Sequence, residues 1–209
     1  MSGAADPTSP SLDDSVKMDP VTLREGVYTV SLEANNYAVI QPGHISYEDG
    51  SKYQGGLKGG KRDGKGTLKY NNGDTYVGEW RADQRHGTGI MTLTAGNVYE
   101  GEWWNGKMNG RGKETFPDKC VYEGQYADGC MKGKGILSFP NGDKYEGQFN
   151  NDRMEGEGTL TYANGDIFTG TFQNGKKHGA GQITYTNGKK FGGTWEMDAL
   201  QGNLAPIPT

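Results

Sequence analysis

The chain has 209 residues, of which 32% are hydrophobic and 36 are glycine, and its formal net charge is −4. A nucleic-acid-binding chain normally carries a basic surplus, so this charge argues against nucleic acid as a partner. Chains this rich in glycine and this poor in hydrophobic residues are often disordered. The residues of this chain are periodic, however, which predicts an ordered structure for most of its length.

The segment before the periodic region has two parts. Residues 1–20 are rich in Ser, Pro and Asp and lack periodicity, which predicts a mobile tail. Residues 21–52 are expected to form an N-terminal cap that contains a degenerate repeat. Within this cap, residues 26–32 and 37–41 are predicted to be short strands. Two arrangements stay open for them: they cap the end of the array or fold back across it.

From Tyr53 onward the chain repeats every 23 residues, with an aromatic residue at the start of each unit and a glycine two residues later. We number the positions of a unit as columns 1 to 23, with Tyr53 in column 1. A fixed period of this length predicts an array of small units instead of a globular core. Residues 191–209 are expected to form a partial repeat and a C-terminal cap. The six full units are expected at 53–75, 76–98, 99–121, 122–144, 145–167 and 168–190.

Within a unit, apolar and polar residues alternate. Columns 1, 3 and 5 hold Tyr145, Gly147 and Phe149 in the fifth unit, and polar residues stand between them. Because successive side chains of a strand point to opposite faces, the aromatic rings share one face, which we call the ring face. The polar side chains of columns 2 and 4 lie on the opposite face, which we call the outer face.

Two turns are predicted in each unit. Asn164-Gly165 in columns 20 and 21 predicts a hairpin turn in which both residues have positive φ, and Asn105-Gly106 in columns 7 and 8 predicts a second turn. The segments between the turns differ in length, and the glycine of column 12 is expected to form a bulge that absorbs the surplus. The predicted fold is therefore all-β: an elongated, single-layer, twisted antiparallel sheet of stacked β-hairpins.

The sequence encodes no amphipathic helix that would cover the ring face. The face must therefore be covered by curling of the sheet, by another copy of the chain or by a partner. Aromatic residues often dominate binding energy, so the rings of columns 5 and 18 are predicted to line a groove for a partner. These groove residues are Trp80, Trp103, Tyr126, Phe149, Phe172, Trp195, Tyr70, Phe116, Phe139, Tyr162 and Tyr185.

The run Tyr99-Glu-Gly-Glu-Trp-Trp-Asn-Gly-Lys-Met-Asn-Gly-Arg-Gly resembles the MORN family (membrane occupation and recognition nexus), as does Tyr145-Glu-Gly-Gln-Phe. The resemblance covers about residues 43–203 and supports the predicted array of hairpins. The sequence departs from the family pattern at Leu57, Glu114 and Asp118-Lys119.

The resemblance implies a non-enzymatic scaffold or protein-interaction module. MORN proteins include radial-spoke head components of cilia and flagella, cytoskeletal scaffolds and adaptors that hold a partner helix. A stand-alone array is most similar to the short radial-spoke head proteins, which implies a cytoplasmic protein of the axoneme or another cytoskeletal assembly. The expected partner is a protein, either a helix or a neighbouring spoke or cytoskeletal component. A homodimer through the open sheet ends is also possible.

The sequence does not predict an enzyme. His86 and His178 both occupy column 11, where they are interpreted as surface turn residues, and the many Gly-x-Gly pairs belong to the repeat instead of a nucleotide site. Cys120 and Cys130 fall in different columns and are expected to be reduced thiols. No catalytic residue, cofactor or metal site is therefore predicted.

A membrane-associated adaptor that binds acidic phospholipid is the alternative function. Basic residues recur in columns 9 and 10 and are expected to form a stripe beside the turns, which could attract anionic lipid. No apolar run has transmembrane length, and Ser2 stands where N-myristoylation needs glycine, so a cytosolic chain without its own lipid anchor is expected. The basic residues are Lys61, Arg62, Arg85, Lys107, Arg153, Lys176 and Lys177.

Overall fold

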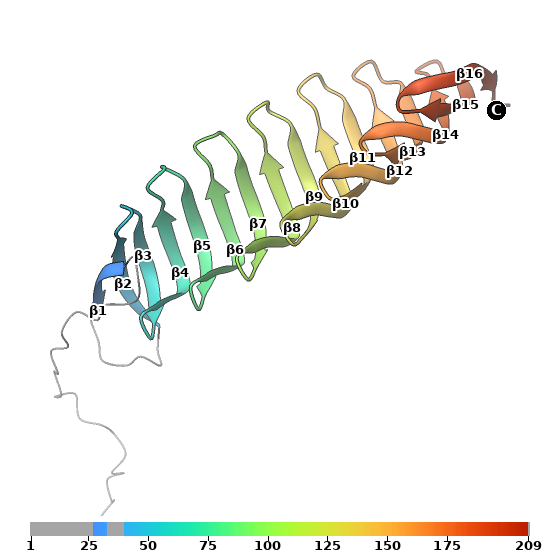
Figure 1. Ribbon diagram of the computed structural model, residues 1–209. Coiled ribbons are helices and arrows are strands. Elements are labelled where there is room, and N and C mark those ends of the chain that lie inside the picture. The colour runs from blue at the N-terminus through green and yellow to red at the C-terminus, as the bar shows by residue number, and fades with distance from the viewer. Residues whose placement is uncertain (1–26, 33–39, 209) are drawn as a thin grey trace, which may run out of the picture.

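The structure is a computed structural model that describes residues 27–32 and 40–208. These residues form one 16-stranded sheet in which each strand pairs antiparallel with its neighbours in chain order. Figure 1 shows the sheet as an elongated, twisted array of hairpins. The predicted fold class is confirmed. The tail predicted over residues 1–20 lies outside the described residues.

The six full units contribute two strands each. These strands are β3 (Lys52–Lys58), β4 (Lys61–Lys69), β5 (Thr75–Arg81), β6 (Gln84–Thr92), β7 (Val98–Trp104), β8 (Lys107–Thr115), β9 (Val121–Ala127), β10 (Cys130–Ser138), β11 (Lys144–Asn150), β12 (Arg153–Thr161), β13 (Ile167–Gln173) and β14 (Lys176–Thr184). The two ends of the sheet are formed by β1 (Val27–Leu32) and β2 (Gln41–Tyr47), and by β15 (Lys190–Glu196) and β16 (Ala199–Pro206).

At the N-terminal end, β1 pairs with β2 and forms the edge of the sheet. The predicted strand over residues 26–32 corresponds to β1, whereas most of the strand predicted over residues 37–41 lies outside the described residues. The turn after β2 repeats the geometry of the later units, because the Tyr47 N–H donates to the Ser51 carbonyl oxygen at 2.9 Å. This segment therefore extends the sheet at its end.

The turns at columns 7 and 8 are two-residue hairpin turns, as predicted. Asn105 and Gly106 have φ values of 47° and 81°. The second unit forms the same turn without glycine, since Ala82 and Asp83 have φ values of 48° and 71°. Asp83 also fastens this turn to the preceding unit, because its Oδ1 accepts a hydrogen bond from the Arg62 N–H at 2.8 Å.

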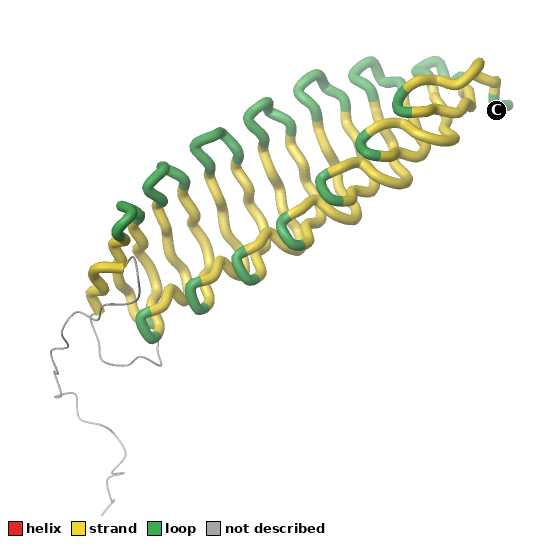
Figure 2. Tube along the Cα trace, viewed as in Figure 1, coloured by secondary structure: helices red, strands yellow, loops and turns green. Residues whose placement is uncertain are grey.

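The turns at columns 18 to 22 differ from the prediction. Of the pair Asn72-Gly73, only Gly73 has a positive φ (90°). The prediction of a two-residue turn with positive φ at both residues is therefore wrong here. The longer turn is stabilised by the Asn72 side chain, whose Nδ2 donates to Asp74 Oδ2 at 2.8 Å. In the third unit Lys119 takes a φ of 72° at the glycine position, so the turn survives the departure at Asp118-Lys119. Figure 2 shows the two kinds of turn along opposite edges of the array.

Consecutive long turns are connected by column-22 aspartates. Asp143 Oδ1 accepts a hydrogen bond from the N–H of Ala163, in column 19 of the next unit, at 2.8 Å. Asp74 and Asp166 make the equivalent bonds. The third unit has Cys120 instead of aspartate in column 22. The residue in column 19 of the next unit is Pro140, which has no N–H to donate. The aspartates therefore stand where a backbone donor can reach them.

The glycine of column 12 forms the predicted bulge. Gly64 has a φ of 81°. In the β3–β4 hairpin, Gly55 lies opposite Gly66 and Leu57 lies opposite Arg62, so one residue of β3 faces three residues of β4. The surplus length of the second strand is taken up at this point, and the strands curl strongly beside the tight turns (Figure 1).

Glycine pairs create the space in which the column-1 rings lie. Gly147 and Gly158 are cross-strand partners, and a Cβ atom on either residue would overlap the ring of Tyr145. The Tyr145 hydroxyl donates to the Gln148 carbonyl oxygen at 3.0 Å. Burial raises the pKa of Tyr145 to about 12. Glycine in columns 3 and 14 is thus a packing requirement of the ring above it.

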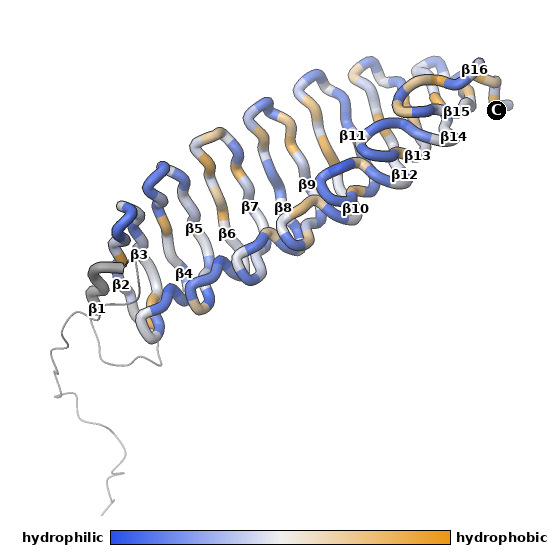
Figure 3. Tube along the Cα trace, in the orientation of Figure 1, coloured by the Kyte–Doolittle hydropathy of each residue, from blue (hydrophilic) through white to orange (hydrophobic). Residues whose placement is uncertain are grey.

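The rings of columns 1 and 5 form a continuous chain from Tyr53 to Trp195. Neighbouring rings meet edge to face, as Tyr122 and Phe149 do with centroids 4.8 Å apart. Curling of the sheet therefore covers these rings, which answers one of the alternatives left open by the sequence. Hydrophobic residues lie mainly within the strands, and hydrophilic residues occupy most of the turns (Figure 3).

Candidate functional site

The eleven predicted groove residues separate into two sets. The column-5 rings are buried, each at most 5% exposed, and the column-18 rings are half-buried. The buried set is Trp80, Trp103, Tyr126, Phe149, Phe172 and Trp195. The half-buried set is Tyr70, Phe116, Phe139, Tyr162 and Tyr185. Of the predicted residues, the column-18 rings are therefore the ones with surface available to a partner.

Two of the column-5 rings are covered by arginine side chains of column 10. The Arg62 guanidinium lies 4.1 Å from the ring centroid of Trp80, and the Arg85 guanidinium lies 4.4 Å from that of Trp103. Both tryptophans also donate from the indole N–H to a backbone carbonyl, Trp80 to Gly66 at 3.2 Å and Trp103 to Gly89 at 3.1 Å. These cation–π contacts and hydrogen bonds fix the rings inside the fold.

The predicted single basic stripe is wrong, because neighbouring residues of a strand point to opposite faces. Arg62, Arg85 and Lys177 of column 10 are half-buried over the rings, and Lys177 Nζ lies 5.5 Å from the Phe168 centroid. The exposed basic residues are those of column 9, which are Lys61, Lys107, Arg153 and Lys176.

The ring face is interrupted in the second and third units. Leu93 occupies column 18 in place of an aromatic ring, and a cavity of 320 Å³ lies beside it. Glu114, the charged residue of the otherwise apolar column 16, lines this cavity. Its Oε1 accepts from Asn97 Nδ2 and its Oε2 accepts from the Tyr126 hydroxyl, both at 3.0 Å. The departure at Glu114 is therefore accommodated by two hydrogen bonds.

The column-11 histidines do not lie in turns, which corrects their interpretation as surface turn residues. His86 belongs to β6 and His178 to β14, and both are half-buried. The His86 ring lies 4.6 Å from the exposed ring of Trp104. Among the described residues, no three His, Cys, Asp or Glu side chains gather as a metal site. Nor does that part of the chain contain a helix long and apolar enough to cross a bilayer.

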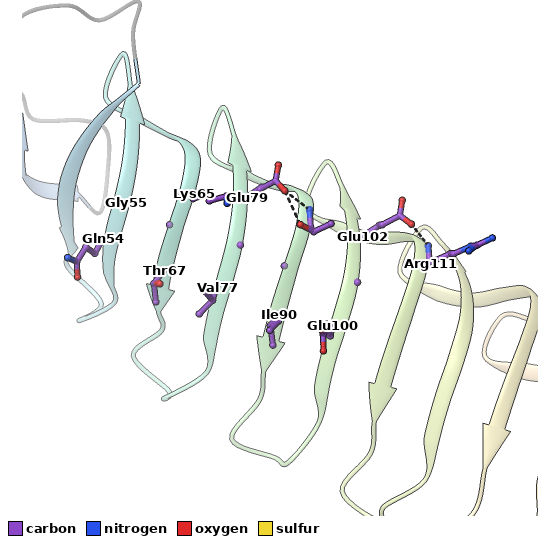
Figure 4. A pocket seen from close by; sticks show the side chains of 15 residues that line it. Gln54, Gly55, Lys65, Thr67, Val77, Glu79, Ile90, Glu100, Glu102 and Arg111 are labelled. Carbon is purple, nitrogen blue, oxygen red and sulfur yellow. Dashed lines mark hydrogen bonds between the residues drawn. The ribbon is translucent and has the colours of Figure 1, made fainter.

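The outer face carries the larger hollow, a groove of 760 Å³ that crosses β3 to β8. Figure 4 shows two rows of side chains along it. One row contains Val77 and Ile90, which are cross-strand partners and 48% and 40% exposed. The other row contains Glu79 and Glu102, which accept hydrogen bonds from Thr88 and from the Arg111 N–H, respectively. The Thr88 bonds hold the pKa of Glu79 below its usual range.

The 23-residue period coincides with a known repeat. The sequence model of the MORN repeat matches six consecutive segments, at residues 53–75, 76–98, 99–121, 122–144, 145–167 and 168–190. The chain belongs to the MORN-repeat family. The matched segments are the six units expected from the sequence.

Solved structures resemble this MORN array in fold. The TCP10 domain of Danio rerio CPAP is 13% identical, with a TM-score of 0.50 over 84% of this chain and 83% of that chain. The TCP domain of Drosophila melanogaster SAS-4 (dCPAP), in complex with a proline-rich motif of Ana2, is 15% identical, with a TM-score of 0.49 over 85% of this chain and 99% of that chain. No curated protein matches the chain in sequence. At these identities the likeness shows the fold alone.

Sequence reasoning missed the outer-face groove of the MORN array. Columns 2 and 4 were interpreted as a polar outer face from the fifth unit, where they hold Glu146 and Gln148. The available signal was the pair Val77 and Ile90, two branched apolar residues in columns that the register places side by side. Exposed Trp104 is a similar departure outside the groove, since column 6 holds a polar residue in every other unit except at Ala127.

Proposed function

We propose that the chain is a non-enzymatic scaffold that binds a protein partner across its ring face. The observation that carries the proposal is the line of half-buried column-18 rings beside the sealed chain of column-1 and column-5 rings. Half-buried aromatic residues offer apolar area with little conformational entropy to lose, which favours a binding role. The column-5 rings contribute by holding this surface in place.

The repeated construction of the ring face supports a binding role over a catalytic one. Catalysis needs a few side chains of different chemistry held together at one place. The ring face instead presents one pattern again and again, and its main interruption, at Leu93 and Glu114, has a single carboxylate whose two oxygens already accept hydrogen bonds. A long partner segment, such as a helix, matches a long repeated surface.

The cellular setting that we propose is an axonemal assembly, with the radial-spoke head as the specific candidate and another cytoskeletal assembly as the broader one. This part rests on the resemblance of a stand-alone MORN array to the short radial-spoke head proteins. Crosslinking mass spectrometry on isolated axonemes tests it. Absence of the protein from axonemes, together with abundance at a cortical cytoskeleton or a membrane, would contradict the setting while leaving the binding surface untouched.

The binding surface is tested by site-specific photocrosslinking in the native assembly. Benzoylphenylalanine is introduced at Tyr162 on the ring face and, in the same unit, at Glu146 on the outer face. We expect a discrete crosslinked protein from the Tyr162 position and none from the Glu146 position. Crosslinks from the Glu146 position alone would place the partner on the outer face and overturn the proposal.

Two alternatives have their own tests. Acidic phospholipid would have to be bound by the exposed column-9 residues such as Lys61 and Arg153, since the column-10 residues cover rings. Salt-sensitive co-sedimentation with phosphoinositide liposomes would support that function. A second copy could pair with the open edge of β16, and sedimentation velocity would detect such a dimer.

A further inference from the structure

The cavity on the ring face lies where the second unit lacks a column-18 ring. At two other places along the array, the column-10 side chain of one unit lies against the column-18 ring of the unit before it. These pairs are Arg62 with Tyr47, which holds the equivalent position of the degenerate repeat, at 5.8 Å from the ring centroid, and Lys177 with Tyr162, at 5.7 Å. In the third unit Met108 occupies column 10, and column 18 of the unit before it holds Leu93. The cavity that both residues line therefore corresponds to the space that a ring fills at those two places.

The size and the walls of this cavity suit an aromatic side chain. Its volume is 320 Å³, and ligand sites span roughly 300–1,000 Å³, so it holds one large side chain and not a folded element. Met91 and Met108 form part of its walls, and the ring of Trp103 lines it as well. A methionine sulfur makes favourable contacts with aromatic rings, and its unbranched side chain adapts to their shape.

One wall of the cavity is polar. The two carboxylate oxygens of Glu114 each accept one hydrogen bond at 3.0 Å, from Asn97 and from Tyr126. A carboxylate has about four acceptor positions, so each oxygen retains one for a further donor. Among the described residues, no Lys or Arg nitrogen lies within 4.0 Å of this carboxylate. A donor that enters the cavity therefore meets an acceptor without an ion-pair partner.

The charges around the cavity favour a neutral donor over a cationic one. Arg85 and Lys107 line the same cavity as Glu114. The Arg85 guanidinium is held there, because it lies 4.4 Å from the Trp103 centroid and donates to the Gly106 carbonyl oxygen at 2.7 Å. A lysine or arginine of a partner would enter beside two like charges, and a carboxylate would enter beside Glu114. The occupant that fits is an aromatic ring with a neutral N–H or O–H donor.

We propose that this cavity is an anchor subsite of the ring face, and that it takes one tryptophan or tyrosine side chain of the protein partner. The ring lies between Met91 and Met108, in the place of a column-18 ring, and its N–H or O–H donates to Glu114. Aromatic side chains that fill a pocket carry much of the energy of many interfaces. The inference rests on the proposed function and deepens it, because an anchor in one unit fixes the register of a partner on a surface that otherwise repeats.

Indole is the probe for the anchor subsite, and the methionine methyl signals of the full chain report where it binds. Met91 and Met108 line the cavity, whereas Met131 and Met154 hold column 10 in later units and serve as internal controls. We expect indole to shift the Met91 and Met108 signals with a dissociation constant on the order of 1 mM. 1-Methylindole has the same ring without the N–H donor and should bind about tenfold more weakly.

Leu93→Tyr fills the cavity with a residue that column 18 already holds at Tyr70 and Tyr162. We expect this variant to keep or raise the unfolding temperature and to remove the indole-induced shifts, because its own ring occupies the subsite. In the native assembly, it should lower the yield of the protein crosslinked from benzoylphenylalanine at Tyr162 about tenfold. The control Phe139→Tyr changes column 18 two units away, leaves the cavity open, and should alter neither result.

The outcomes separate the anchor subsite from the proposed function. A chain with native Leu93 that crosslinks no protein from Tyr162 would contradict the proposed function and the anchor with it. An equal or higher yield from Leu93→Tyr would overturn the anchor alone, because an added column-18 ring would then only enlarge the binding surface. The indole test uses the unaltered chain and applies even where Leu93→Tyr fails to fold. No shifts at Met91 and Met108, or equal binding of indole and 1-methylindole, would also overturn the proposal.

Discussion

The two faces of the sheet follow different rules. Column 1 of the ring face holds tyrosine or phenylalanine in every unit, whereas columns 2 and 15 of the outer face hold Val77 and Ile90 in one unit and Thr169 and Gln182 four units later. The difference has a physical cause. A column-1 ring must fill the space above two glycines and contact two column-5 rings, so little variation is tolerated. Outer-face side chains meet water, and their variation is available for recognition.

The strongest expected disturbance of the ring face is alkaline pH, because it acts on many units at once. Burial raises the pKa of Tyr122 and Tyr145 to about 12, while an unfolded chain ionises its tyrosines near pH 10. The unfolded state therefore loses protons first, and stability present below pH 10 is lost as the pH rises toward 12. NMR signals of the Tyr122 and Tyr145 rings and the circular dichroism of the strands should change together. Ionisation of Tyr122 or Tyr145 that precedes loss of the strand signal would contradict a sealed ring face.

Removing one buried ring should give the clearest difference in stability between changes on the ring face and changes on the outer face. Tyr122→Ala should lower the free energy of unfolding by about 3–5 kcal/mol, because the ring is fully buried between Tyr126 and Phe149. The neighbouring outer-face change Glu123→Ala should alter it by less than about 0.5 kcal/mol. Urea titrations of both variants measure the difference. Similar losses from the two changes would remove the distinction between the faces.

The interruption at Glu114 sharpens the comparison inside the ring face. Glu114→Leu should cost about 1–3 kcal/mol, because it leaves the buried hydroxyl of Tyr126 without its acceptor. Adding Tyr126→Phe removes that hydroxyl and should recover most of the loss, since column 5 already holds Phe149 and Phe172. A double-mutant cycle from urea titrations gives the coupling. Additive effects would show that Glu114 and Tyr126 act independently.

The smallest expected effect on stability concerns the hydrogen bonds between consecutive long turns. Asp143→Ala should cost about 0.5–1 kcal/mol, because the N–H of Ala163 loses its side-chain acceptor. The matched change Cys120→Asp should have no measurable benefit, because its neighbour in column 19 is Pro140, which has no N–H. Thermal unfolding of both variants provides the measurement. Stabilisation by Cys120→Asp would show that charge, and not the hydrogen bond, accounts for these aspartates.

The sequence predicts the repeated features well and the unit-specific ones poorly. The period, the glycine bulge and the turn at Asn105-Gly106 follow from local rules that every unit obeys. The turn at Asn72-Gly73 was mistaken because side-chain hydrogen bonds to Asp74 favour a longer loop. Curling of the sheet buries the column-5 rings and depends on the cumulative bend at the bulges. The alternation of apolar and polar residues along a strand does not predict the size of that bend. The outer-face groove was missed because periodic reasoning averages over units.

The central claim is that the column-18 rings bind a partner while the deeper rings hold the fold. The direct measurement uses a double variant that carries both Phe139→Ser and Tyr162→Ser. Its stability is measured in solution, and its recovery in the cytoskeletal fraction is measured in cells that lack the native chain. Both rings are half-buried, so we predict a chain that unfolds cooperatively with strand content unchanged but no longer sediments with that fraction. A folded variant that still sediments like the parent would contradict the claim.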